Sequence, residues 1–300
     1  MNGTMWLIAL ALATGQADAG EKPPAKREMG PADVRVLPAT VPTLIDHYGP
    51  AARQIGELRV PAGKGPFPVA VVIHGGCWTN GFETLRGTAP IASALAARGI
   101  ATWNVEYRQV GDPGGGWPGS FQDWGAATDH LRTLAARYPL DLTRTIVVGH
   151  SAGAHAALWV ASRGRLPRTS AIRGADPLPV HSAVAIDGPG DLAPFVGVDA
   201  AVCGKPVIVP LMGGTPAAVP DRYREGAPAR QLPLGLPQTL VASVVLTPPL
   251  AQAYRRAAVA GGDRVTVVTT PGSDHFNVIA PGTPQWRDVE AAIVAAVPAR

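Results

Sequence analysis

The sequence predicts an α/β fold built on a mostly parallel sheet of eight strands with helices on both faces. Short runs rich in Val, Ile and Ala recur along the chain and alternate with segments whose apolar residues follow a helical spacing. From the third run onward the runs are almost continuously apolar, which is typical of strands covered on both faces of a parallel sheet. This alternation predicts right-handed crossovers between neighbouring strands.

The first two candidate strands, residues 43–49 and 54–60, alternate polar and apolar residues and lie close together in the chain. They are expected to form an antiparallel hairpin at one edge of the sheet. The six remaining candidate strands are residues 69–73, 100–107, 145–149, 181–187, 239–245 and 264–270. The helices predicted between the strands are residues 89–97, 121–138, 152–162, 249–260 and 286–297.

One connection is too long for a simple crossover between strands. Residues 188–236 carry many prolines and glycines, and they predict a cap over the C-terminal edge of the sheet. Residues 20–40 are rich in Pro, Lys and Ala and are interpreted as a leader. We therefore expect a single folded domain at residues 41–300 that includes the cap.

The N-terminus resembles an export signal. The apolar run Met5–Ala13 is too short to span a bilayer, and Ala17-Asp18-Ala19 forms a small-residue cleavage pattern before Gly20. Residues 1–19 are therefore predicted to be a signal peptide, and the protein to be periplasmic or secreted, with a cytoplasmic location as the alternative. No cysteine lies near the cleavage pattern, so no lipid anchor and no stable membrane attachment are expected.

Composition and charge narrow the class of protein further. The chain is 46% apolar and 16% charged, which indicates a globular protein. Its net charge is +4, but the basic residues are mostly isolated arginines without interleaved aromatic residues. A nucleic-acid partner is therefore not expected. The spacing of the two cysteines, Cys77 and Cys203, matches no zinc pattern, and sequence alone does not decide whether they form a disulfide.

Ser151 is the candidate nucleophile. It lies in TIVVGHSAGAH, where a buried strand passes directly into a helix that begins with small residues. This context is typical of a nucleophile elbow, a tight turn that projects a serine hydroxyl from the edge of the sheet. Gly149 and Gly153 are expected to permit the close approach of strand and helix, whereas a serine that only caps a helix would not require them.

A glycine-rich loop precedes the elbow by about seventy residues. The strand at residues 69–73 is followed by HGGCW, and the glycines leave backbone N–H groups free to bind an oxyanion. The N–H groups of Gly75, Gly76 and Cys77 are the candidates, together with that of Ala152 after the nucleophile. His74 lies before the glycines and is interpreted as a residue that holds this loop.

His275 is the candidate general base. It follows the last predicted strand in RVTVVTTPGSDHF, which gives the chain order of serine, then acid, then histidine. His150 and His155 flank the nucleophile and are expected to have packing or hydrogen-bonding roles.

Four motifs, HGGCW, VEYR, GHSAGAH and PGSDHF, together resemble the α/β-hydrolase superfamily of the esterase and lipase type. HGG-x-W with GHSAGAH is similar to the kynurenine formamidase (arylformamidase) branch and its bacterial carboxylesterase relatives. The resemblance covers about residues 50–297. It implies an α/β-hydrolase domain, Ser151 as nucleophile and His275 as base, with an oxyanion hole formed by Gly75, Gly76, Cys77 and Ala152.

The acid of this arrangement is missing from its usual place after the seventh strand, where Val244 and Val245 stand instead. Asp274 adjoins the base and cannot easily face its far nitrogen. Asp187 ends the sixth predicted strand and is the favoured substitute, because a buried acid must reach His275 to fix its tautomer. Asp191, four residues later, is the alternative, although it can equally cap the segment that follows.

These features predict a serine hydrolase that cleaves a carboxylic ester or an activated amide through an acyl-Ser151 intermediate. No cofactor or metal is implied, and a small-molecule substrate is the expected partner. The alternatives are an aryl formamidase acting on an N-formylkynurenine-type substrate and a catalytically impaired hydrolase fold that serves as a binding protein. Trp78, Trp117 and Trp124, with the cap, are expected to line an apolar substrate pocket.

Overall fold

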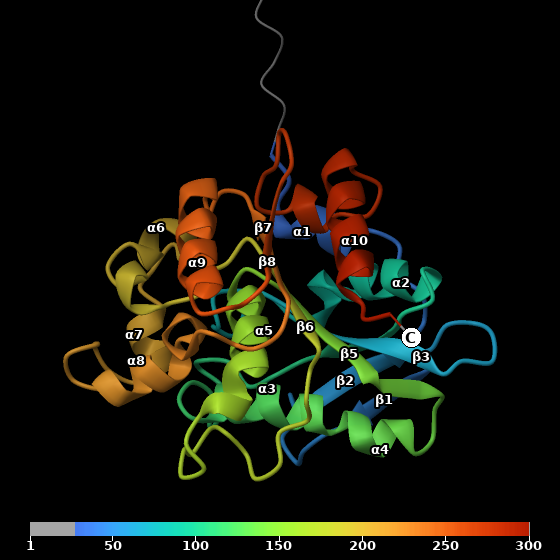
Figure 1. Ribbon diagram of the computed structural model, residues 1–300, viewed down its shortest axis with the longest axis horizontal. Coiled ribbons are helices and arrows are strands. Elements are labelled where there is room, and N and C mark those ends of the chain that lie inside the picture. The colour runs from blue at the N-terminus through green and yellow to red at the C-terminus, as the bar shows by residue number, and fades with distance from the viewer. Residues whose placement is uncertain (1–27, 300) are drawn as a thin grey trace, which may run out of the picture.

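A computed structural model describes residues 28–299 and contains one eight-stranded sheet with the order β1-β2-β4-β3-β5-β6-β7-β8 (Figure 1). The strands are β1 Leu44–His47, β2 Ile55–Arg59, β3 Phe67–Ile73, β4 Ala101–Val105, β5 Leu140–His150, β6 Ser182–Ile186, β7 Gln238–Ala242 and β8 Val265–Thr269. The β1 and β2 strands are antiparallel to their neighbours, and the pairs from β4 to β8 are parallel. The predicted fold class is confirmed.

The apolar strands are covered on both faces by helices. Along β3, Val69, Val71 and Ile73 pack into one core, while Ala70 and Val72 pack into the other. This alternation explains why the strand is apolar at every position. The first core is covered by α3 Gly119–Asp129, α4 Leu131–Ala135, α5 Ala152–Ser162 and α9 Pro248–Ala260, and the second by α1 Pro31–Arg35, α2 Ala89–Ala97 and α10 Pro284–Ala296 (Figure 1).

The segment between β6 and β7 forms the predicted cap. It contains three short helices, α6 Asp199–Cys203, α7 Ile208–Met212 and α8 Pro220–Gly226. Within residues 28–299, no helix is long and apolar enough to cross a membrane.

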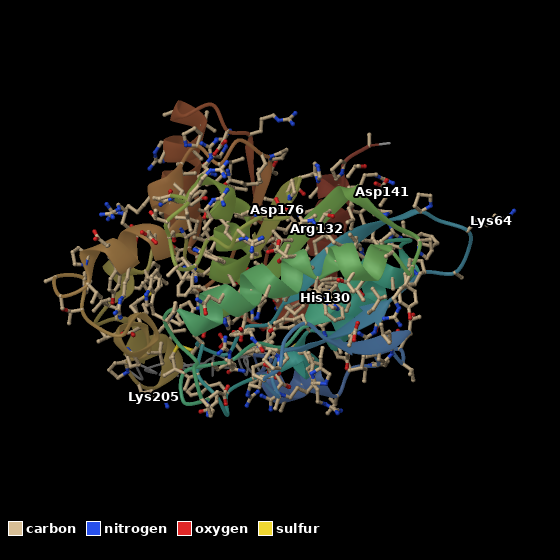
Figure 2. All side chains as sticks on the ribbon, turned by 90° about the horizontal axis from the view of Figure 1, so that it is seen from below. Lys64, His130, Arg132, Asp141, Asp176 and Lys205 are labelled. Carbon is tan, nitrogen blue, oxygen red and sulfur yellow. A yellow bond between two sulfur atoms is a disulfide. The ribbon has the colours of Figure 1, made fainter. Side chains whose placement is uncertain are left out.

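Four of the five predicted helices match the structure to within two residues at each end, and the fifth prediction is wrong in one respect. Residues 121–138 form two helices, α3 and α4, that meet at His130 (Figure 2). At this break the carbonyl of Ala127 accepts the indole N–H of Trp103, which reaches across from β4 (2.9 Å). A bond from the sheet to a helix carbonyl cannot be read from helical periodicity.

The expected domain start at residue 41 is placed too late. Residues 31–35 form α1, and Val34 is only 1% exposed in the core shared with α2 and α10. Arg35 also pairs with Glu83 at 2.9 Å. The described part of the supposed leader is therefore packed against the domain. The predicted signal peptide, residues 1–19, lies outside the described residues.

His155 is buried in the middle of an aromatic cluster under α5. Its ring makes edge contacts with Phe121 and Trp124, and Nε2 donates to the carbonyl of Gly226 in the cap (2.7 Å). Burial lowers the pKa of His155 from 6.5 to about 4. The imidazole is therefore neutral in the folded protein at pH values where it is charged in the unfolded chain.

We expect this difference to make the protein less stable in acid. As the pH falls from 6.5 toward 4, the unfolded chain gains a proton on His155 that the folded chain does not accept. The unfolding free energy should fall by at most about 1.4 kcal/mol per pH unit from this residue. Urea denaturation at several pH values should show that His155→Gln flattens the slope by up to one proton, and an unchanged slope would contradict the assignment.

Candidate active site

Ser151 lies at a strained turn between β5 and α5. Its φ is 57° and its ψ is −120°, a conformation that non-glycine residues rarely adopt. A Cβ added to Gly149 would collide with the carbonyl oxygen of Gly153, and a Cβ added to Gly153 would collide with that of Ile73. The two glycines therefore allow α5 to approach the sheet as the sequence predicts, and the turn leaves Ser151 facing a cavity at the C-terminal ends of the strands.

Asp187 and His275 form a short side-chain hydrogen bond at the site. Asp187 directly follows β6, and its Oδ2 lies 2.7 Å from Nδ1 of His275, which follows β8. A carboxylate only accepts, so Nδ1 carries the proton and Nε2 is left with the lone pair needed by a base. Burial alone would raise the pKa of Asp187, but the hydrogen bond from His275 and that from the N–H of Leu246 hold it below its usual value.

The loop after β7, where the sequence lacks the expected acid, binds the side chain of Asp187. The N–H groups of Val245 and Leu246 donate to Oδ1 of Asp187 at 2.9 and 2.8 Å, and that of Val244 lies 3.3 Å from Oδ2. These bonds satisfy a carboxylate whose side chain is fully buried. The loop after β7 therefore binds the acid through its backbone.

The other two carboxylates near the motif are used elsewhere. Asp191 accepts the N–H of Ala193 at 3.1 Å and pairs with Arg230 at 2.9 Å. Asp274 accepts the N–H groups of Phe276 and Asn277 and so shapes the loop that carries His275. Of the three candidate acids, Asp187 is the one that contacts the base.

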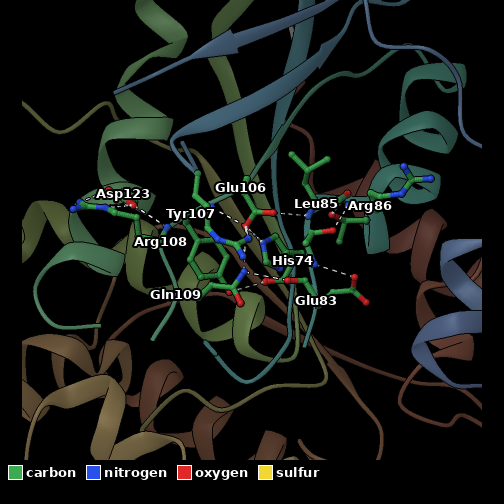
Figure 3. Close-up of polar contacts among 12 residues, drawn as sticks. His74, Glu83, Leu85, Arg86, Glu106, Tyr107, Arg108, Gln109 and Asp123 are labelled. Carbon is green, nitrogen blue, oxygen red and sulfur yellow. Dashed lines mark hydrogen bonds and ion pairs between the residues drawn. The ribbon is translucent and has the colours of Figure 1, made fainter. Parts of the chain in front are cut away.

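The glycine-rich loop lies against the elbow. Gly76, Cys77 and Trp78 all have positive φ values, between 53° and 97°. A Cβ on Gly75 would lie 2.9 Å from Cβ of Ser151, so the loop approaches the serine as closely as glycine permits. His74 lies beneath the loop, where it contacts Glu106 and the carbonyl of Gly75 (Figure 3).

Ser151 lies between two cavities. The larger has a volume of about 280 Å³ and is lined by His275, His150, the glycine loop and residues of α1. The smaller, about 30 Å³, is apolar and is lined by Trp78, Ala152 and residues of the cap. Pro31 and Val34 of α1 also line the larger cavity, which the sequence did not indicate. The one available signal was Val34, an apolar residue in this short helix.

Cys77 and Cys203 form a disulfide that lines both cavities. It links the glycine-rich loop to α6 of the cap across 126 residues of chain. The disulfide therefore joins the loop beside Ser151 covalently to the cap.

The three tryptophans have different positions. Trp78 lines the small cavity and is 4% exposed. Trp124 does not line a pocket as expected, because it is fully buried in the core between Phe121 and Trp159. Trp117 packs edge-on against Phe121 and lies outside both described cavities. Trp117 and Trp124 therefore do not line the substrate pocket as predicted, because both pack into the aromatic core under α5.

His150 packs against His275 and binds its backbone. Its Nε2 donates to the carbonyl of His275 at 2.7 Å, and the two rings lie 4.5 Å apart. Burial and the neighbouring His275 lower the pKa of His150 to about 3. It is therefore a neutral neighbour that fixes the backbone of His275 without adding a like charge to the site.

The chain is similar to several known proteins. A model of the BD-FAE family matches residues 58–242. Esterase LipC of Mycobacterium tuberculosis (strain ATCC 25618 / H37Rv) is 32% identical over 90 residues, which is 30% of this chain. The chain spans 22% of the length of this curated relative.

Similar solved structures include Esterase B from Lactobacillus Rhamnosis (HN001), with a TM-score of 0.70 and 21% identity over 88% of each chain. A truncated carbohydrate esterase from gut microbiota has a TM-score of 0.69 and 18% identity, covering 84% of this chain and 94% of its own. Bacterial heroin esterase has a TM-score of 0.65 and 22% identity, covering 82% and 80%.

The contacts of Asp187 predict a large effect of its removal on ester turnover. Asp187→Asn should lower kcat for p-nitrophenyl acetate by about 10⁴-fold, because an amide no longer holds the imidazole in the useful tautomer. Asp191→Asn, at the neighbouring carboxylate that pairs with Arg230, should change kcat by less than about threefold. Equal losses in the two variants would refute the assignment.

Proposed function

The chain belongs to the BD-FAE family, an α/β-hydrolase esterase family, and on that premise we propose that it cleaves carboxylic esters through an acyl intermediate on Ser151. The observation that carries this proposal is the 2.7 Å contact between Asp187 and His275 at the cavity that Ser151 lines. Together these residues have the chemistry of a serine-hydrolase triad.

In the first half of the proposed reaction, Nε2 of His275 takes the proton of the Ser151 hydroxyl while Oγ attacks the ester carbonyl. The negative charge moves to the carbonyl oxygen, where N–H groups of Gly76, Cys77 and Ala152 bind it. His275 then returns the proton to the leaving alcohol as the C–O bond breaks. Asp187 stabilises the imidazolium that exists between these two proton transfers.

In the second half, water replaces the alcohol. His275 takes a proton from the water as its oxygen attacks the acyl carbonyl, and the same N–H groups bind the second oxyanion. The proton then passes to Oγ of Ser151, which releases the carboxylic acid and restores the enzyme. All proton transfers use residues of this chain, and the overall reaction consumes one ester and one water.

A related esterase supports a serine mechanism. Esterase B from Lactobacillus Rhamnosis has also been solved with a tributyrin phosphonate as inhibitor.

The interpretation as an impaired hydrolase fold depended on the missing acid after the seventh strand, and the contact of Asp187 with His275 removes that reason. An aryl formamide would use the same steps, with an amine as the leaving group, and is compared directly in the assay below.

We expect Ser151→Ala to lower kcat for p-nitrophenyl acetate by about 10⁴-fold or more, because the attacking atom is lost. The variant should also fail to react with a fluorophosphonate probe detected on a gel. Ser93→Ala, on α2 outside both cavities, serves as the control and should retain labelling and turnover. Turnover by Ser151→Ala at the wild-type rate would exclude the mechanism, and a higher kcat/KM for an aryl formamide than for the ester would reassign the substrate class.

We also propose that the protein is exported. The disulfide between Cys77 and Cys203 supports this location, because disulfides persist in oxidising compartments and are rare in the cytosol. The apolar run and the Ala-Asp-Ala pattern in residues 5–19 match a signal peptide, which would direct the chain to the export machinery.

Mass spectrometry of the protein purified from its native host tests the route. The expected N-terminus is near Gly20, because cleavage after a small-residue pattern removes the signal. Recovery of the chain from the cytosolic fraction with residue 1 still present would show that it is not exported.

A further inference from the structure

We propose that His74 is a buried imidazolium, paired with the carboxylate of Glu106, which orients and polarises the Gly75–Gly76 peptide for oxyanion binding. His74 would thus be a positioning residue for the reaction, acting through the backbone and not on the substrate. The inference about its role rests on the proposed function, whereas the inference about its charge does not.

Both ring nitrogens of His74 face acceptors. The side chain is fully buried, with Nδ1 2.8 Å from the carbonyl oxygen of Gly75 and Nε2 2.9 Å from Oε1 of Glu106 (Figure 3). A carbonyl oxygen cannot donate, so Nδ1 must carry a proton. If Glu106 is ionised, Nε2 must carry one as well, and the ring is then charged.

The surroundings of Glu106 favour its ionised form. Its Oε1 also lies 3.1 Å from the N–H of Tyr107 and 3.2 Å from the side-chain amide of Gln109, and its Oε2 lies 3.3 Å from the N–H of Leu85. These three N–H donors favour the ionised form of the carboxyl group without counting His74. Burial alone would raise the pKa of Glu106, but His74 and the N–H of Tyr107 bring it below the usual value.

The other charged or titratable groups nearby fit this assignment. Arg53 lies 3.5 Å from Oε1 of Glu106 and pairs at 2.7 Å with Asp112. Tyr107 stacks on the His74 ring with centroids 4.5 Å apart, and burial raises its pKa well above the ordinary value, so it stays neutral. Glu83, which lines the same cavity, pairs with Arg35 at 2.9 Å. The imidazolium therefore lies in a cluster whose positive and negative charges balance.

The pair controls the direction of one peptide group. The Gly75 carbonyl is bound by Nδ1 of His74, and the Tyr107 hydroxyl lies 3.4 Å from it. The Gly75–Gly76 peptide is not among the cis bonds of the chain, so its N–H points opposite to its carbonyl and away from the buried ring. This N–H has no hydrogen-bond partner among residues 28–299, and Gly76 lines the cavity with Ser151.

A positive charge on the carbonyl side of a peptide strengthens its N–H as a donor, because hydrogen bonds in a chain polarise one another. In a site that excludes water, this effect acts on the oxyanion of the transition state. We therefore expect the pair to affect kcat more than substrate binding.

Two variants separate charge from geometry. Glu106→Gln keeps the shape of the side chain and can offer its amide N–H₂ to Nε2, so a neutral His74 retains its bond to Gly75. His74→Gln removes the ring altogether. His130→Gln is the matched control, because His130 (labelled in Figure 2) also pairs with a carboxylate, that of Asp46 at 3.1 Å. His130 lines neither of the two cavities beside Ser151.

Nitrogen-15 NMR of histidine-labelled wild-type protein at pH 7.5 reports the protonation state directly, with the His74 signals assigned by their loss in His74→Gln. We expect both ring nitrogens of His74 to be protonated in the wild type and only one in Glu106→Gln. For p-nitrophenyl acetate, Glu106→Gln should lower kcat by about tenfold and His74→Gln by about 10²-fold, with KM changed by less than about threefold. His130→Gln should retain the wild-type kcat.

A neutral His74 ring in the wild-type spectrum would overturn the proposed charge, and it can be read even where Glu106→Gln fails to fold. A wild-type kcat in folded Glu106→Gln would overturn the positioning role. Failure of the proposed function has a different signature, because Ser151→Ala would then retain turnover while the His74 spectrum is unaffected.

Discussion

The site depends on the close approach of α5 to the sheet at the turn that carries Ser151. Gly149, Gly153 and the carbonyl of Ile73 meet there with no space for a β-carbon, and the serine takes a positive φ as a result. This contact fixes the start of α5 against the ends of β3 and β5. The glycine loop after β3, the acid after β6 and the base after β8 are then arranged around one hydroxyl. Strain at the nucleophile is the local cost of this arrangement.

The relocated acid shows how neighbouring parallel strands can exchange a role. The ends of β6 and β7 lie side by side, so a carboxylate after either strand can reach the loop after β8. Burying a carboxylate is unfavourable unless it is bonded, and here the backbone of the loop after β7 donates to it together with His275. The loop after β7, which has no acidic side chain of its own, thus takes part in the same network through its backbone.

Much of the fold could be predicted from local pattern, because its strands are buried on both faces and its helices α2 and α5 have clear ends. Ser151, His275 and Asp187 could also be named as candidates from their places at strand ends, and the structure brings Asp187 and His275 into contact. What could not be predicted depends on contacts between distant segments. The carbonyl at the break between α3 and α4 is bound by the indole of Trp103, and Trp124 is enclosed by an aromatic cluster. Val34 joins a core formed by distant segments from β3 to α10. Periodicity carries no information about such partners.

The disulfide has a consequence for when the enzyme matures. One of its cysteines belongs to the loop beside the nucleophile and the other to the cap, so forming the bond joins two segments that folding alone must otherwise bring together. In a chain whose two cysteines are still free thiols, the loop beside Ser151 and the cap are not covalently linked. If the protein is exported as we propose, the disulfide forms only after the chain leaves the reducing compartment where it is made. Under that proposal, the wall of the cavity beside Ser151 becomes covalently complete in the compartment to which the protein is delivered.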